Sequence, residues 1–325
     1  MKRVFVLGVL AGVGALSMAV SGQAQGPSAK AIEATKIEKV KDNLYVITGS
    51  GAGDNSVFSG GNVAVFITDA GVTLVDTKLP GFGPTLLERI KTVTNKPVTR
   101  IINTHTHGDH TGGNAFFGTT VETVVQENTK ANMARMDEFK GANAKFLPGK
   151  TYKDRMTIGS GKDQIDLYYF GRGHTNGDTF VVFTAARTMH VGDIFAWKAL
   201  PFVDTANGGS VVEQPVSLAR AADTVRNVDT IINGHIPVAP FSALREYANF
   251  TADFVAYAQA SMKAGKTVDQ AAAAYKVDPK YRGYVASVNP AFGGPKGNLQ
   301  IAYDELRKQA GAPSSQTSVV KERRS

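Results

Sequence analysis

The stretch that best indicates the fold of this chain is residues 101–110, with the sequence IINTHTHGDH. The chain has only six histidines, and three of them, His105, His107 and His110, lie here beside Asp109. Chance clustering of so rare a residue is improbable. Imidazole and carboxylate groups are common ligands of divalent metals, so this stretch predicts a metal site.

The apolar residues before the cluster predict a strand over 98–103 that ends just before His105. Ligands of open α/β sheets gather beyond the carboxyl ends of strands. Side chains alternate along an extended segment, so His105 and His107 can hold one metal together. Asp109 and His110 are expected in a following turn, where they can reach a second metal. We expect the glycines at 108, 112 and 113 to give that turn its conformational freedom.

Three more candidate ligands each follow an apolar run, usually beside a glycine. They are His174, Asp193 and His235. All of them can therefore reach one rim of a sheet. His190 lies within the strand that precedes Asp193 and is expected to face the other side, as a packed residue.

The pattern around the cluster predicts an α/β domain over residues 40–240. The segments 72–76, 84–93 and 98–103 predict a βαβ unit with parallel strands and a right-handed crossover. Antiparallel neighbours are expected before it. Further strands are predicted at 44–48, 63–68, 121–127, 166–170, 179–183, 188–191 and 230–232, and helices at 128–139 and 213–226. Residues 25–40 have the character of a polar lead-in.

The character of the sequence changes after Pro240. Aromatic residues recur at helical spacing from Tyr247 to Tyr257, and further helical segments are predicted near 271–275 and 299–308. We expect residues 241–311 to form a helical extension packed on the main domain, and residues 312–325 to be a disordered tail.

Residues 1–24 have the pattern of a secretory signal peptide. Lys2 and Arg3 precede the apolar run Val4–Val20, and small residues follow it, with a cleavage site after Ala24. The run is short for a retained membrane anchor, which needs about 20 apolar residues. The mature protein is therefore expected to be exported, periplasmic or secreted, with no stable membrane span.

The composition narrows the possible functions. The chain has no cysteine, so disulfides and cysteine ligands are excluded, and any zinc site must use His, Asp or Glu. The net charge is +8, but the basic residues are dispersed and no nucleic-acid motif is present. A small-molecule substrate is the expected partner.

The ordered set His-X-His-X-Asp-His, Gly-His-Thr, Gly-Asp and Gly-His resembles that of the metallo-β-lactamase fold superfamily. The resemblance covers about residues 40–240 and implies an αββα sandwich with two metals, expected to be Zn²⁺ with iron or manganese as alternatives, at one edge of the two sheets. The ligand assignment that it implies is His105, His107 and His174 for the first metal, Asp109, His110 and His235 for the second, and Asp193 as the bridge. It also implies that Asp76 orients ligating histidines, and Asp178 is either a similar support or a simple turn residue.

The resemblance further implies a hydrolase in which a metal-bridged hydroxide attacks the substrate while Asp109 orients it or passes a proton. An aspartate at the position of Asp193 is typical of the glyoxalase II-like thioesterase, lactonase-like and phosphodiesterase-like branches. The expected target is therefore an ester, thioester, lactone or amide bond. A periplasmic β-lactamase-like enzyme is the alternative within this class.

Other interpretations remain open from the sequence. One is a mononuclear iron enzyme like the persulfide dioxygenases, although seven candidate ligands favour two metals. Another is a metal-binding protein without catalysis. The loop after Asp193 carries Trp197 and Lys198, which can line a substrate pocket, with Lys198 holding an anionic group, or form a lid against the C-terminal helices.

Overall fold

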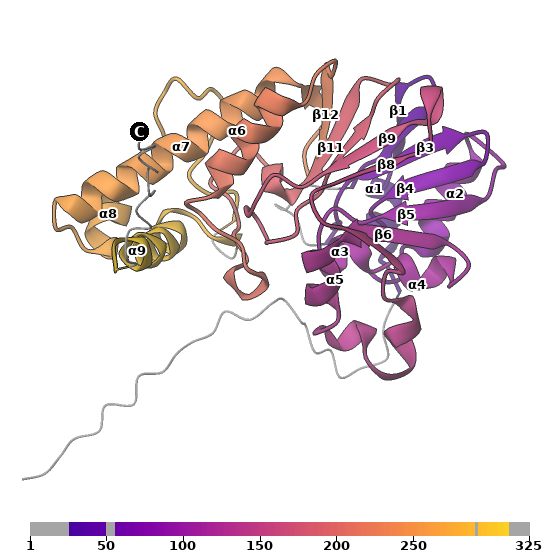
Figure 1. Cartoon of the computed structure of the whole chain (residues 1–325), viewed down its shortest axis with the longest axis horizontal. Helices are drawn as coiled ribbons and strands as arrows, with labels where there is room; N and C mark the ends of the chain where they lie inside the picture. The colour runs from indigo at the N-terminus through magenta and orange to yellow at the C-terminus, as the bar shows by residue number, and fades with distance from the viewer. Residues whose placement is uncertain (1–25, 50–55, 290–291, 312–325) are drawn as a thin grey trace, which may run out of the picture.

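Two β-sheets with helices on their outer faces form the body of the protein in this computed structural model (Figure 1). The structure describes residues 26–49, 56–289 and 292–311. The predicted signal peptide at 1–24 and the predicted disordered tail at 312–325 lie outside the described residues. The α/β sandwich expected from the sequence is confirmed.

The first sheet follows the order of the chain from β1 to β7. Its strands are β1 Ile37–Lys41, β2 Leu44–Ile47, β3 Val63–Thr68, β4 Gly71–Val75, β5 Val98–Ile102, β6 Glu122–Gln126 and β7 Lys150–Tyr152. Strands β1 to β4 are antiparallel neighbours, whereas β4 to β7 are parallel. The predicted parallel pair is therefore confirmed, with α2 (Gly83–Lys91) connecting β4 and β5.

The second sheet has the order β13-β12-β11-β10-β9-β8. Its strands are β8 Arg155–Ile158, β9 Ile165–Tyr168, β10 Phe180–Phe183, β11 Thr188–Gly192, β12 Thr230–Asn233 and β13 Ala239–Pro240. The pair β11 and β12 is parallel, and α6 (Gln214–Thr224) connects them. Both sheets thus contain a parallel pair whose carboxyl ends can present ligands.

Burial on both faces explains why several strands are continuous apolar runs in the sequence. In β3, Ala64 and Phe66 face the second sheet, and the Phe66 ring lies 4.9 Å from that of Phe183 on β10. Val63 and Val65 face the other way, toward α2. A strand covered on both faces needs no polar alternation.

The connections of the first half contain short helices. They are α3 Gly108–Thr111, α4 Asn114–Phe117, α5 Glu127–Met133 and the 3₁₀ turns η1 Asp137–Phe139 and η2 Gly141–Phe146. The helix predicted over 128–139 was therefore too long, because α5 ends at Met133 and only 3₁₀ turns follow. The second half adds the 3₁₀ turns η3 Gly161–Asp163, η4 Asp193–Phe195 and η5 Thr205–Asn207.

The prediction that residues 25–40 form only a polar segment before the first strand was wrong. It contains α1 (Ala29–Ala34), capped by the Ser28 hydroxyl, which accepts a hydrogen bond from the Ala31 amide. It also contains most of β1, an edge strand with no fully buried residue. An edge strand has little apolar patterning, so it resembles a loop in sequence.

The C-terminal residues form three helices on the outer face of the second sheet. They are α7 Ser242–Lys263, α8 Val268–Ala274 and α9 Pro295–Gly311. Figure 1 shows α6 to α9 gathered on one flank and α2 on the opposite flank. One apolar cluster joins these helices to the sheet, and the Tyr247 ring of α7 stacks 4.2 Å from Phe195. Among the described residues, no helix is long and apolar enough to cross a membrane.

Candidate metal centre

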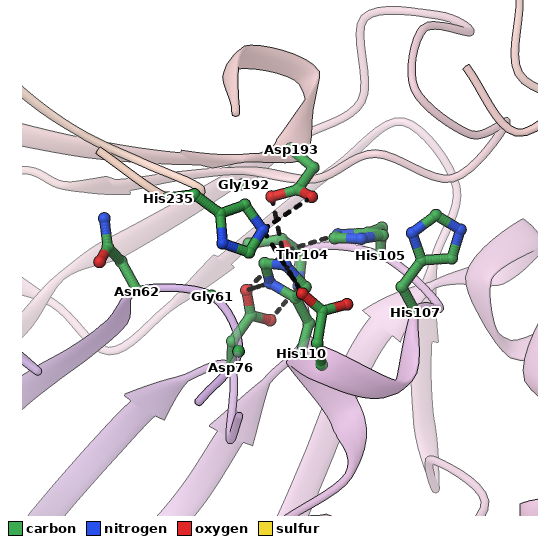
Figure 2. A network of polar contacts seen from close by, with 12 residues as sticks. Gly61, Asn62, Asp76, Thr104, His105, His107, His110, Gly192, Asp193 and His235 are labelled. Atoms are coloured by element: carbon green, nitrogen blue, oxygen red, sulfur yellow. Dashed lines mark hydrogen bonds and ion pairs between the residues drawn. The ribbon is translucent and has the colours of Figure 1, made fainter. Parts of the chain in front are cut away.

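The structure brings the seven predicted ligands together at one edge of the sandwich. His105 and His107 follow β5, and the one-turn helix α3 carries Asp109 and His110. His174 lies between β9 and β10, Asp193 follows β11, and His235 follows β12. Figure 2 shows labelled side chains from both sheets converging on one region. The site therefore lies where the carboxyl ends of the parallel strands of both sheets meet.

These residues form two groups. One contains His105, His107 and His174, and the other contains Asp109, His110, Asp193 and His235. Within each group, the possible ligand atoms all lie within 4.8 Å of one another. The first group has the residues predicted for the first metal, and the second has those predicted for the second metal together with Asp193, which was predicted as the bridge.

Distances in the second group suit a small cation. His110 Nε2 lies 3.4 Å from Asp109 Oδ2 and 3.2 Å from Asp193 Oδ1. His235 Nε2 lies 3.4 Å from Asp109 Oδ2 and 3.1 Å from Asp193 Oδ2. Tetrahedral bonds of about 2.0–2.2 Å place neighbouring ligand atoms about 3.3–3.6 Å apart. The donor atoms are thus nearly at coordination spacing.

The carboxylate of Asp193 lies between the two groups. Its Oδ2 atom is 3.9 Å from Nε2 of His174 and 3.1 Å from Nε2 of His235, while its Oδ1 atom faces His110. In the first group, His174 Nε2 lies 2.9 Å from His107 Nδ1. This placement is the one that a carboxylate shared by two cations requires.

Burial gives a direct test of whether a metal fits. Three atoms, His105 Nε2, His110 Nε2 and Asp193 Oδ1, are buried and make no hydrogen bond within the described part of the chain. A buried polar atom without a partner costs about 1–3 kcal/mol, so most proteins satisfy such atoms. Metal coordination would satisfy all three. The residues present therefore fit divalent cations.

Asp76 fixes the orientation of His110. Its Oδ2 atom lies 2.7 Å from His110 Nδ1, and it also accepts a hydrogen bond from the Thr104 hydroxyl at 2.7 Å (Figure 2). The same hydroxyl lies 3.0 Å from His105 Nδ1. Asp76 is fully buried and has a φ of 68°, a strained conformation for a residue other than glycine. The predicted role of Asp76 in orienting histidines thus has a geometric basis.

Asp204 has a similar place beside the first group, although it was not predicted from the sequence. Its Oδ2 atom lies 2.8 Å from His107 Nε2, while its main-chain amide donates to the carbonyl of His174 at 2.8 Å. It therefore connects two candidate ligands that come from different sheets. Outer carboxylates of this kind set the tautomer and orientation of a ligating imidazole. The sequence offered no signal, because Asp204 lies in an irregular loop outside the motif.

Asp178 and His190 lie beside the candidate ligands but belong to neither candidate metal group. Asp178 accepts hydrogen bonds from the amide and hydroxyl of Thr175, the residue after His174. Burial raises the pKa of Asp178 to about 7. His190 is buried with Nε2 3.1 Å from the carbonyl of Asn62, and it belongs to neither candidate metal group.

The surroundings shift the pKa values of the candidate histidine ligands in different directions, and within the first group His107 has a raised pKa because Asp204 and Asp109 outweigh its burial. Burial lowers the pKa of His174 to about 4 and that of His105 well below its usual value, so both imidazoles are neutral at pH 7. Burial also acts on His110, but the carboxylates of Asp193 and Asp109 outweigh it and raise the pKa of His110. The second group therefore holds a proton where a cation would bind, and metal binding there would release it.

A glycine segment before β3 lies against the second group. The Gly61 amide donates to the Asp109 carbonyl at 3.0 Å, and the buried ammonium of Lys78 donates to the Gly61 carbonyl at 3.0 Å. The side chain of Asn62 donates to the carbonyls of Asn233 and Ile236, on either side of His235. This segment therefore joins the first sheet to the loop that carries a ligand from the second.

The glycines of the motif do not act as the sequence suggested. Among the described residues, positive φ angles do not include Gly108, Gly112 or Gly113, so no left-handed turn is needed there. Gly112 and Gly113 instead allow close packing, because an added Cβ would lie 2.3 Å from Pro80 and Thr77 respectively. A Cβ at Gly108 would meet nothing within 4 Å. The expected turn is the helix α3.

The fold and the site together define a metal-binding protein built on a two-sheet sandwich. Comparison with known families agrees, since the model of the metallo-beta-lactamase superfamily matches residues 57–236. The chain belongs to this superfamily, and its members related to this chain are metal-dependent hydrolases.

Named relatives agree with this assignment. The chain is 27% identical over 208 residues to "Metallo-beta-lactamase type 2" of Elizabethkingia meningoseptica, covering 62% of this chain and 78% of the relative. It is 22% identical over 198 residues to "Metallo-beta-lactamase IND-1" of Chryseobacterium indologenes, covering 60% and 80%. The solved "Metallo-beta-lactamase from Pontibacter korlensis" superposes with a TM-score of 0.57 at 22% identity, over 67% of this chain and 99% of that one. This last likeness concerns the fold.

Proposed function

We propose that this chain is an exported hydrolase that uses two divalent cations to cleave an ester, thioester, lactone or amide bond. The first cation would be held by His105, His107 and His174, the second by Asp109, His110 and His235, with Asp193 shared between them. The observation that carries this proposal is the set of buried imidazole and carboxylate atoms that make no hydrogen bond and face one another near coordination spacing, above all His110 Nε2 and Asp193 Oδ1 at 3.2 Å.

Zinc is the cation that we propose for both positions. The candidate ligands are nitrogen and carboxylate oxygen only, because the chain has no cysteine. Neutral imidazoles such as His105 and His174 suit zinc, and iron and manganese accept the same ligand types. Metal analysis of the purified protein distinguishes these ions.

Two divalent cations would lower the pKa of a shared water and polarise the bond to be cleaved. The chain would contribute orientation and proton handling. The side chains of His107 and Asp109 keep 21% and 20% exposure, whereas that of His110 has none, so the site is reached from the side of His107 and Asp109. Asp109 would thus both face the cation and accept a proton from a water on the open side.

The proposed type of bond rests on Asp193. The resemblance to the superfamily implies that an aspartate at this position is typical of thioesterase-like, lactonase-like and phosphodiesterase-like branches. β-Lactam hydrolysis is the second candidate, and the 27% identity to a protein named as a metallo-beta-lactamase favours it. Export, to the periplasm or beyond, is proposed from the basic and apolar pattern of residues 1–24.

The test combines metal analysis with a substrate panel of esters, thioesters, lactones, β-lactams and phosphodiesters. We expect two metal ions per chain and turnover of a carboxylic ester, thioester or lactone. Asp109→Asn should lower turnover by about 10²–10⁴-fold, because the residue would lose both its charge and its capacity to accept a proton. Asp137→Asn is the matched control, since that exposed aspartate pairs only with Lys140 in the described structure.

Two results would contradict the proposal. One is wild-type turnover by Asp109→Asn. The other is a single iron per chain together with oxygen uptake on a persulfide, which would make the protein a dioxygenase-like oxidoreductase. Preferential turnover of β-lactams would instead support the second candidate.

A further inference from the structure

Three aromatic rings from two distant parts of the chain meet beside the metal centre. Trp197 and Phe202 lie on the loop after η4, and Phe292 lies just before α9. The Phe292 ring is 5.7 Å from that of Trp197 and 6.4 Å from that of Phe202. We call these three residues the aromatic wall. Its third ring comes from the C-terminal extension, beyond the part of the chain that matches the family model.

The aromatic wall contacts histidines of both candidate metal groups. The Phe202 ring lies 5.9 Å from the His107 ring and 5.7 Å from the His174 ring. The Trp197 ring lies 5.9 Å from His235. Because His107 is also one of the more exposed candidate ligands, the wall borders the side from which a substrate approaches.

The C-terminal extension holds the wall in place. The side chain of Asn298 in α9 donates to the Pro201 carbonyl at 3.0 Å, next to Phe202. The amide of Val285 donates to the Lys198 carbonyl at 3.0 Å, next to Trp197. Both anchor points flank the wall residues, so the rings are positioned before a ligand binds. Such preorganisation favours affinity.

The wall offers apolar surface and little polarity. Phe202 and Phe292 are half-buried, so part of each ring stays exposed, whereas Trp197 is 5% exposed and its Nε1 donates to the Leu200 carbonyl. Lys198, predicted as an anion anchor, does not point into the wall. Its ammonium lies over the Tyr284 ring, 5.3 Å from the centroid, and Tyr284 belongs to the apolar cluster around α7.

We infer that the aromatic wall is a substrate subsite that selects molecules with an uncharged hydrocarbon or aromatic group beside the bond that is cleaved. This inference rests on the proposed function and adds the substrate class to it. Apolar rings next to the reacting position stabilise a substrate group that they can cover, and they disfavour a charged group that finds no partner there. Apolar esters, thioesters and lactones are therefore preferred over charged ones.

Trp197 is the only tryptophan in the chain, so its fluorescence reports binding at the wall without any need for turnover. The metal-free protein would be titrated with acetamide, butanamide, hexanamide and octanamide, and with succinamate as a charged analogue of butanamide. Affinity should rise with chain length, by up to about four-fold per methylene group, and succinamate should bind more weakly than butanamide.

Variants test whether the aromatic wall causes this dependence of affinity on chain length and charge. Phe292→Ala should flatten the dependence on chain length, and Phe292→Lys should shift the preference toward succinamate. Phe116→Ala is the control, because Phe116 is an exposed phenylalanine on α4 whose ring meets that of Phe117 edge to face. That control should behave like the wild type.

A second series uses p-nitrophenyl esters of two to eight carbons with the metal-loaded protein, and kcat/KM should rise with acyl length in the wild type but less in Phe292→Ala. Chain-length-dependent amide binding without hydrolysis of any panel substrate would overturn the proposed function and leave the subsite standing. Equal amide affinities across the series, or a Phe292→Ala variant that keeps the wild-type slope, would overturn the subsite.

Discussion

Gly61 and Gly108 lie at the same metal centre but carry different constraints. A Cβ added to Gly61 would lie 2.1 Å from Cε1 of His110, far inside van der Waals contact. Neither partner is free to move, because the Gly61 carbonyl accepts from Lys78 and the His110 ring is held by Asp76 at 2.7 Å. A Cβ added to Gly108 would meet nothing within 4 Å.

Gly61→Ala should therefore displace His110. We expect the affinity of the second position for its metal to fall by about 10–100-fold and turnover to fall with it, as for other changes that misorient a ligand. Gly108→Ala is the matched control in the motif itself and should keep both metals and near-normal turnover. Native mass spectrometry gives the metal count, and steady-state kinetics gives the turnover. Two tightly bound metals in Gly61→Ala would show that the close approach of Gly61 does not constrain His110.

The candidate ligands could be predicted at the residue scale, because rare residue types recur beside glycines after apolar runs. The structure brings all seven together, while their role as ligands remains a proposal. Residues that act on the ligands could not be predicted as easily. Asp204 and Lys78 belong to common residue types and have no local pattern, and only the folded chain places them beside His107 and Gly61.

At the scale of elements, prediction succeeded where burial leaves a strong pattern. Strand β3 was predicted with its observed bounds, because both of its faces are covered and its residues are almost all apolar. Strands β7 and β8 were missed. They are short, and their polar residues face solvent, so their pairing depends on neighbours that are distant in sequence.

Helix α9 illustrates how the C-terminal elements contribute to stability. Leu299 is fully buried in the cluster that joins α7 and α9 to the second sheet, whereas its neighbour Gln300 is exposed. Leu299→Ala should lower the free energy of unfolding by about 2–5 kcal/mol, through lost apolar contact and the cavity that remains. Gln300→Ala should change it by less than about 0.5 kcal/mol. Urea denaturation followed by circular dichroism measures both, and equal midpoints would mean that α9 does not share the core.

At the scale of the whole molecule, the metal centre is also a junction between the two sheets. Asn62 connects the start of β3 to the loop around His235, and Asp204 connects the His107 and His174 segments. Because the candidate ligands come from both sheets, cations bound there would add to these connections. Ligands that bind only the folded state raise its stability, so removal of the metals should also loosen this junction.

The buried side-chain amine of Lys78 lies in that junction and links the stability of the whole molecule to pH. Its side chain is fully buried, and burial lowers its pKa from 10.5 to about 7. In the unfolded chain the ammonium would keep its proton up to the ordinary value. Between these two pKa values the unfolded state binds more protons, so the free energy of unfolding should rise with pH, by at most about 1.4 kcal/mol per pH unit.

Lys78→Met removes this titration while it keeps the length and apolar character of the stem. The difference in free energy of unfolding, wild type minus variant, should therefore increase between pH 7 and pH 9 in the metal-free protein, and it should be flat below about pH 6. Other titrating groups are common to both proteins, so the difference isolates Lys78. Urea denaturation at each pH supplies the values. Parallel curves for the two proteins from pH 7 to pH 9 would mean that the buried ammonium keeps its proton in the folded state, stabilised by the carbonyls of Gly60 and Gly61.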